Sequence, residues 1–202
     1  NAKIKLKDIV WSFSGVRPLY DDGASKAQEA TRDYVIKAEE NDSLLMVNIF
    51  GGKITTYRRL SEAILKHIEE FLGKKGESWT RQSSLPGGNM DVDGQLPLQN
   101  KLHKIYPFLP VETLKRLVRS YGTVSFDIFD GAKNIESLGE SFGSGLYEKE
   151  VIYLIQKEWA RTSEDILFRR SKLGLSLTKN EINQLDKFLE SYLKQSKVSE
   201  NI

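Results

Sequence analysis

The chain has 202 residues, and its 30 lysines and arginines against 28 aspartates and glutamates leave a formal net charge of +2. That balance excludes the strongly basic surface of a nucleic-acid binder, and no apolar stretch is long enough to cross a bilayer. The absence of cysteine excludes disulfides and thiolate chemistry and fits a reducing compartment, and two histidines are too few for a histidine-based metal site.

The first third of the chain predicts strands followed by a helix. Ile9–Phe13 and Tyr34–Ile36 are strand-like, and Leu44–Phe50 is a nearly continuous apolar run typical of a sheet that is covered on both faces. From Tyr57 to Leu72 apolar residues recur every three or four positions, which predicts a helix that ends at Gly73. We expect this order to be the closing unit of an α/β domain.

A stretch rich in Gly, Ser and Pro follows, and beyond it the pattern is helical. We therefore expect an α+β chain in which residues 1–75 end a larger domain, 76–96 form a linker and 97–202 form a helical domain. The period of the apolar residues predicts helices over 111–121, 146–159 and 162–170. A last helix is predicted after the capping-box pair Thr178 and Glu181, with fraying beyond Lys194, and bundle-core positions are predicted for Tyr153, Trp159 and Phe168.

A glycine turn joins the predicted strand at 44–50 to the predicted helix. Gly51 and Gly52 let the backbone approach a ligand closely, and the first N–H groups of a helix favour an anion or an electron-rich ring. Lys53 would make this site more electropositive, although a helix-capping turn with a solvated lysine is the alternative. Because no strand–GxGxxG–helix unit precedes the turn, we expect the chain to hold the second half of a cofactor site and to be part of a longer protein.

Two arginines are further candidates for binding an anion. Arg17 stands between Gly15 and Pro18 and could offer its guanidinium to a carboxylate or a phosphate, or it could be a surface residue in a turn. Arg32 could do the same, or it could pair with Asp33. The basic run at 169–172 is expected to be a solvated helix end. Together with Lys53, the two arginines predict a phosphorylated or carboxylated ligand.

The motifs, taken in order, resemble a known family. Ile9–Leu19, Thr31–Tyr34 and Phe50–Arg58 are similar to the C-terminal part of aerobic, FAD-dependent glycerol-3-phosphate dehydrogenases. The helical half carries the resemblance in Leu85–Gly88, Tyr106–Leu109, Arg119–Gly122 and Glu158–Arg161, and on to Arg170. Ser141 and Phe168 depart from the family pattern, which has Asp and Trp there.

The resemblance implies an activity and a set of site residues. The family oxidises sn-glycerol 3-phosphate to dihydroxyacetone phosphate, moving a hydride to FAD and electrons to a membrane quinone. By motif, Arg17 and Arg32 would bind the substrate, and the flavin would be lined by Gly51, Gly52, Lys53, Ile54 and Thr55. Lys53 would also act catalytically near the flavin or the substrate oxygen, while the general base cannot be assigned.

The resemblance also implies where the protein works. We expect a cytoplasmic enzyme, with room for peripheral association with the inner face of a membrane and for a homodimer. Because the turn for the FAD pyrophosphate would precede this chain, the chain alone should be inactive and should not hold FAD tightly. The alternatives are a glycerol-3-phosphate oxidase that uses oxygen, and a non-catalytic helical interaction module.

Overall fold

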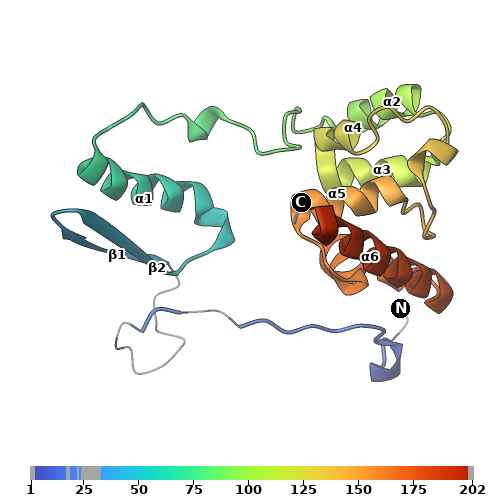
Figure 1. Cartoon of the computed structure of the whole chain (residues 1–202), viewed down its shortest axis with the longest axis horizontal. Coiled ribbons are helices and arrows are strands. Elements are labelled where there is room, and N and C mark those ends of the chain that lie inside the picture. Colours follow the sequence, from blue (N-terminus) through green and yellow to red (C-terminus); the bar gives the residue numbers. More distant parts are fainter. Residues whose placement is uncertain (1–2, 17–18, 22, 24–32, 200–202) are drawn as a thin grey trace. The chain divides into compact units, whose positions relative to one another are not determined.

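The structure is a computed structural model that describes residues 3–16, 19–21, 23 and 33–199, with side chains as far as 195. It contains two compact units. The strand unit is Ser12–Ser83, and the helical unit consists of Asn1–Trp11 with Ser84–Ile202. The predicted class, an α+β chain with a helical C-terminal part, is confirmed (Figure 1). The division into a domain end at 1–75, a linker at 76–96 and a helical domain at 97–202 stays a prediction.

The strand unit is an antiparallel hairpin followed by a helix. β1 (Tyr34–Asn41) pairs with β2 (Leu44–Gly51), and the Asn41 side chain closes their turn by accepting the N–H groups of Ser43 and Leu44. The short 3₁₀ turn η2 (Ile54–Thr56) leads into α1 (Tyr57–Leu72), which lies beside the hairpin (Figure 1). The C-cap of α1 is Gly73 with φ of +81°, so the predicted helix and its stop are confirmed.

Two strand predictions need correction. Ile9–Phe13 is not a strand: a 3₁₀ turn, η1 (Leu6–Asp8), precedes it, and no described strand pairs with it. The run Leu44–Phe50 is a strand, but it is not covered on both faces, because Leu44 is 60% and Met46 48% exposed. Within the described residues, β2 pairs with β1 alone. An apolar run shows that a strand can be buried, but it does not supply the neighbours that bury it.

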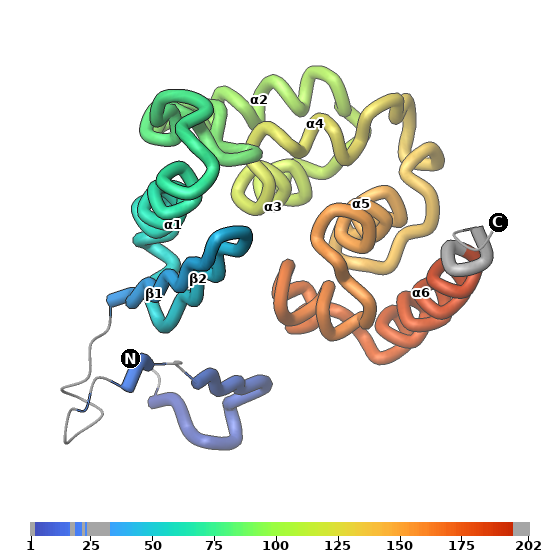
Figure 2. The backbone as a smooth tube through the Cα atoms, turned by 60° about the vertical axis from the view of Figure 1, so that its left-hand side comes forward, coloured from blue at the N-terminus to red at the C-terminus, as the bar shows by residue number. Residues whose placement is uncertain are grey.

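The helical unit is built from five α-helices and shorter turns within the described residues (Figure 2). These are α2 (Gln95–Ile105), α3 (Val111–Tyr121), α4 (Ser125–Ile128), α5 (Glu148–Glu158) and α6 (Lys179–Ser199). The predictions of α3, α5 and α6 are confirmed, and the predicted segment at 162–170 contains a π-helix, η6 (Asp165–Arg170). Helix α6 continues past Lys194, where fraying was predicted, and α2 was missed because its apolar period is weak and Pro97 lies in its first turn.

The core of the helical unit consists of two clusters of buried side chains. One cluster joins α2, α3 and the segment after α4, and the other joins α5, η6 and α6. Members with no exposed surface include Leu102, Leu114, Leu117, Phe129 and Leu138 in the first, and Phe142, Val151, Leu154, Ile166 and Leu185 in the second. The amphipathic stripes read from the sequence are therefore the core of the unit.

Three aromatic residues were predicted to lie in this core, and the prediction for Trp159 is wrong. Tyr153 and Phe168 pack against the clusters, but Trp159 is 76% exposed. Trp159 is the C-cap of α5 and has left-handed backbone angles, so its side chain leaves the helical stripe that its position in the sequence would continue. Phe168 also stacks on the ring of Trp11, with centroids 5.4 Å apart.

Polar groups complete the ends of these helices. The capping box is confirmed: the Glu181 carboxylate accepts the Thr178 N–H at 2.7 Å, and this bond lowers the pKa of Glu181. The basic run at 169–172 is not a simply solvated helix end, since Arg169 pairs with Asp165 at 2.9 Å and Arg170 with Glu158 at 3.6 Å.

Candidate functional site

The glycine turn has the backbone geometry that requires glycine. Gly51 has φ of +68° and Gly52 has φ of +101°, and residues other than glycine rarely adopt this region of backbone conformation. A Cβ built on Gly52 would lie 3.4 Å from the Cβ of Tyr34, which is an ordinary contact. Conformation, rather than lack of space within this chain, therefore explains the second glycine. Gly52 is exposed, so its backbone is accessible to a ligand.

The helix start beyond the turn presents donors to solvent. Thr56 donates its N–H to the carbonyl oxygen of Lys53 at 3.0 Å, which is the first bond of this helical segment. The N–H groups of Ile54 and Thr55 precede that bond, so they resemble the unpaired first-turn donors of any helix. Lys53 and Thr55 are exposed, and Ile54 is 89% exposed. Residues 51–58 contain no carboxylate, so the donors and the lysine together favour a negatively charged or electron-rich ligand.

The two candidate substrate arginines, Arg17 and Arg32, lie outside the described residues. Tyr20, which follows Arg17 by three positions, lies within the described residues. Tyr20 packs against Phe50, with ring centroids 5.3 Å apart, and Lys37 lies 5.0 Å above the Tyr20 ring. Phe50 directly precedes Gly51, so the residue that follows the motif around Arg17 contacts the strand that leads into the glycine turn. The contact of Tyr20 with Phe50 was not predicted from the sequence, because a single aromatic residue in a loop carries no periodic signal.

A buried ion pair joins α3 to α5 in the helical unit. The side chain of Glu150 has no exposed surface, and it accepts two hydrogen bonds from Arg116, at 2.6 and 2.7 Å, and a third from the Tyr121 hydroxyl at 2.7 Å. Arg116 also donates to the carbonyl oxygen of Gly145 at 2.8 Å. Burial, with the adjacent carboxylate, raises the pKa of Tyr121 far above its ordinary value, so its hydroxyl remains a donor. Neither Arg116 nor Glu150 was predicted, since in sequence both look like ordinary polar-face residues of helices.

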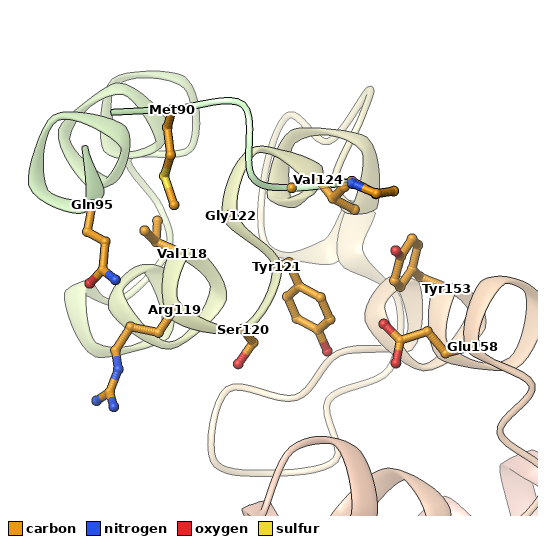
Figure 3. A pocket seen from close by; sticks show the side chains of 12 residues that line it. Met90, Gln95, Val118, Arg119, Ser120, Tyr121, Gly122, Val124, Tyr153 and Glu158 are labelled. Carbon is orange, nitrogen blue, oxygen red and sulfur yellow. The ribbon is translucent and has the colours of Figure 1, made fainter. Parts of the chain in front are cut away.

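A cavity of about 350 Å³ lies beside this network (Figure 3). Its lining includes residues from three motifs that are distant in sequence: Pro86 and Gly87, the segment 119–122, and Glu158 at the end of α5. The first two motifs meet at Gly87, whose carbonyl oxygen accepts the N–H of Thr123 at 3.0 Å. Gly122 has φ of +55°, and a Cβ there would overlap that same oxygen. The cavity therefore depends on glycine at both positions.

The described residues show neither a metal centre nor a membrane-spanning helix. No group of three or more histidine, aspartate or glutamate side chains is arranged there to hold a metal ion. None of the described helices combines the length and the apolar character that crossing a bilayer would require.

The comparison with known families defines the class. Residues 78–201 match the family described as the C-terminal domain of alpha-glycerophosphate oxidase, and the chain belongs to this family. The resemblance read from the motifs is thereby confirmed.

Individual relatives extend the match to the strand unit. The chain is 38% identical over 194 residues to aerobic glycerol-3-phosphate dehydrogenase of Escherichia coli and 41% identical over 190 residues to glycerol-3-phosphate dehydrogenase of Pseudomonas aeruginosa. It is also 41% identical over 179 residues to D-erythritol 1-phosphate dehydrogenase of Brucella abortus. These matches cover 96%, 94% and 89% of the chain, but only 38%, 37% and 36% of the respective relatives. The chain thus spans a little over a third of the length of these relatives.

Proposed function

We propose that the chain is the C-terminal part of an FAD-dependent dehydrogenase that oxidises a polyol phosphate, with sn-glycerol 3-phosphate as the substrate and dihydroxyacetone phosphate as the product. The observation that carries the proposal is the glycine turn, whose positive φ angles and exposed donors suit close approach to a flavin, in a chain whose relatives are named for glycerol 3-phosphate. The relatives' greater length leaves room for the other half of the FAD site.

The residues of the turn fit a bound flavin. FAD, when bound, supplies the hydride acceptor. Gly51 and Gly52 would let the backbone approach the ring, while the N–H groups of Ile54 and Thr55 and the ammonium of Lys53 would stabilise the negative charge that develops there. Fixed donors of this kind need no reorganisation during the reaction, which is why they lower a barrier effectively. This assigns Lys53 to charge stabilisation beside the flavin or the substrate oxygen.

In this proposal Arg17 and Arg32 bind the phosphate of the substrate. A guanidinium matches the geometry of phosphate oxygens and is charged at any physiological pH. The packing of Tyr20 on Phe50 supports a place for the Arg17 motif near the turn. D-Erythritol 1-phosphate is the second candidate substrate, because one relative of equal identity is named for it and it also carries a phosphate on a polyol.

The electron acceptor and the setting complete the proposal. We infer a quinone acceptor, reached by a cytoplasmic enzyme that binds peripherally to the inner membrane face and that could be a homodimer. Oxygen is the alternative acceptor, because the matching family is described by an oxidase. The chain alone is expected to be inactive and to bind FAD weakly.

The test uses the complete protein encoded with this chain. Purified protein should be yellow, should reduce a soluble quinone with glycerol 3-phosphate, and should do so faster than with D-erythritol 1-phosphate. Hydrogen peroxide in place of reduced quinone would identify an oxidase. A colourless protein that oxidises neither phosphate would refute the proposal and favour the helical interaction module.

Variants separate the substrate residues from the cofactor residues. Arg17→Ala and Arg32→Ala should each lower kcat/KM by roughly tenfold to a hundredfold, because a charge-assisted hydrogen bond is lost, while the flavin content stays normal. Arg81→Ala, an exposed arginine outside the motifs, is the matched control and should behave like the parent protein. Unchanged kinetics in both variants would remove the two arginines from the site.

A further inference from the structure

A second cavity of the helical unit has a mostly basic lining. It has a volume of about 440 Å³ and is formed by one side of α3 and by the residue that directly follows η6. The lining residues are Glu112, Lys115, Arg116, Arg119, Ser120 and Ser171. Three basic side chains and one carboxylate therefore line this cavity, which leaves an excess of positive charge.

The spacing of these residues along α3 explains why they share one cavity. Lys115 and Arg119 are four positions apart, so they lie one turn apart on the same side of the helix, and Glu112 precedes Lys115 by three positions. The opposite side of the helix packs into the core through its buried apolar residues Leu114, Leu117 and Val118. Lys115 and Arg119 are exposed, so a ligand can reach both.

Two of the three cations lack a counter-ion in the part of the chain that the structure describes. Arg116 is paired with the buried Glu150, but neither Lys115 nor Arg119 forms an ion pair there. Figure 3 shows that the side chain of Arg119 extends away from Glu158, the carboxylate of the neighbouring cavity. Like charges four positions apart on a helix repel each other, and a bound anion would relieve this repulsion.

Hydrogen-bond donors accompany the charge. The Nε–H of Arg116 is buried and has no acceptor among the described residues, which is uncommon in folded proteins. The hydroxyl of Ser120 also makes no hydrogen bond with a described residue, whereas Ser171 donates to the carbonyl oxygen of Ile166 at 2.7 Å and so completes the wall. An oxyanion, or a water bound with it, would be the acceptor that these donors lack.

Arg119 has a simpler structural role as well. It lies in the last turn of α3, where a cation offsets the negative end of the helix dipole. That role explains neither the charge of Lys115, one turn earlier, nor the unsatisfied donor of Arg116. It also requires no added anion, so a measurement of anion binding distinguishes the two roles.

We propose that this cavity binds the phosphate group of a ligand. Lys115 and Arg119 supply the charge, and a phosphate offers acceptors in more directions than a planar carboxylate does, which suits donors from several side chains. The volume leaves room for the organic group that carries the phosphate. A soluble phosphorylated metabolite and the headgroup of an anionic phospholipid share this chemistry. The proposal does not depend on the proposed oxidation, because none of the residues assigned to that reaction lines this cavity.

The test uses the whole chain, labelled with ¹⁵N and followed by NMR. Inorganic phosphate, added at constant ionic strength against sodium chloride, should shift the amides of Lys115, Arg119 and Ser120 until they saturate. Its affinity should be about tenfold higher than that of acetate, which is the planar, singly charged control. Equal affinity for phosphate and acetate would overturn the assignment to phosphate.

Variants test which residues bind the anion. Lys115→Gln and Arg119→Gln should each weaken phosphate binding about tenfold, and Glu112→Gln should strengthen it several-fold, because it removes the one carboxylate of the lining. Lys179→Gln, at an exposed position of α6 outside the cavity, is the matched control and should bind like the wild type. Unchanged thermal unfolding checks the fold, and unchanged affinity in both Lys115→Gln and Arg119→Gln would overturn the proposal.

Vesicles distinguish the two sources of phosphate. The chain is sedimented with vesicles of phosphatidylcholine alone and with vesicles that also contain phosphatidylglycerol. Binding to the second kind only, lost in Arg119→Gln and kept in Lys179→Gln, would identify a lipid headgroup as the ligand. Saturable binding of inorganic phosphate without vesicle binding would identify a soluble phosphorylated ligand. Binding of neither would overturn the proposal.

Discussion

Replacing Arg116 with methionine should destabilise the helical unit by about 3 to 5 kcal/mol, the usual cost of removing one partner from a buried ion pair. The magnitude follows from the geometry, because Glu150 is fully buried and receives two of its three hydrogen bonds from Arg116. Without the guanidinium, the carboxylate keeps only the Tyr121 hydroxyl. Methionine fills much of the same space, so the loss reports on charge rather than on a cavity. A loss of this size should lower the Tm by roughly 10 to 20 °C.

Thermal and urea unfolding followed by far-UV circular dichroism would measure this loss. Lys115→Met, at an exposed position on the same helix, is the matched control and should change stability by less than about 0.5 kcal/mol. The double variant Arg116→Met with Glu150→Leu should recover most of the loss, since the unpaired charge is then gone. A loss below about 1 kcal/mol in Arg116→Met would refute the reasoning, because a carboxylate truly buried beside this arginine could not tolerate its removal so easily.

The remaining predictions concern single backbone and carboxylate positions. Gly122→Ala should cost about 2 to 5 kcal/mol in the same unfolding assay, because its φ is unsuited to a side chain and the new methyl would overlap the Gly87 carbonyl; a neutral result would show that the contact is loose. Partial burial would raise the pKa of Asp165, but hydrogen bonds from the segment before it lower the pKa below 3.8, so its stabilising effect is present above that pH and is lost as the pH falls through the folded value. Asp165→Asn should therefore lower the Tm by a few degrees at pH 7 and by less at pH 3, and an equal loss at both would contradict the assignment. In the complete protein, the Gly52→Val variant should fold but lose flavin absorbance. Full flavin occupancy with normal turnover would show that the turn only starts the helix and does not bind the flavin.

Local patterns were sufficient for the elements whose cause is local. The stripe of apolar residues at three and four positions predicted α3 and α6, and the Thr178 and Glu181 pair predicted a cap that the structure contains. The turn at 51–52 was also readable, because only glycine commonly adopts the positive φ that both residues have.

Features that depend on the neighbours of a segment could not be read in this way. No described strand pairs with the strand-like residues around Val10, and the apolar run of β2 is partly exposed because β1 is its only described neighbour in the sheet. Trp159 fits the helical period but leaves it at a left-handed cap, a change of backbone conformation that the period does not encode.

The sequence by itself therefore determined the helical periodicity, the caps, the glycine turn and, through the order of its motifs, the family. Only the tertiary structure decided that Arg116 and Glu150, 34 positions apart, form one buried pair, and that Gly87 and Gly122 bring two motifs to one cavity. The physical reason is that periodicity and capping arise from interactions between residues a few positions apart. A buried charge or a cavity exists only where distant segments pack, and its energy depends on burial, which no single segment possesses.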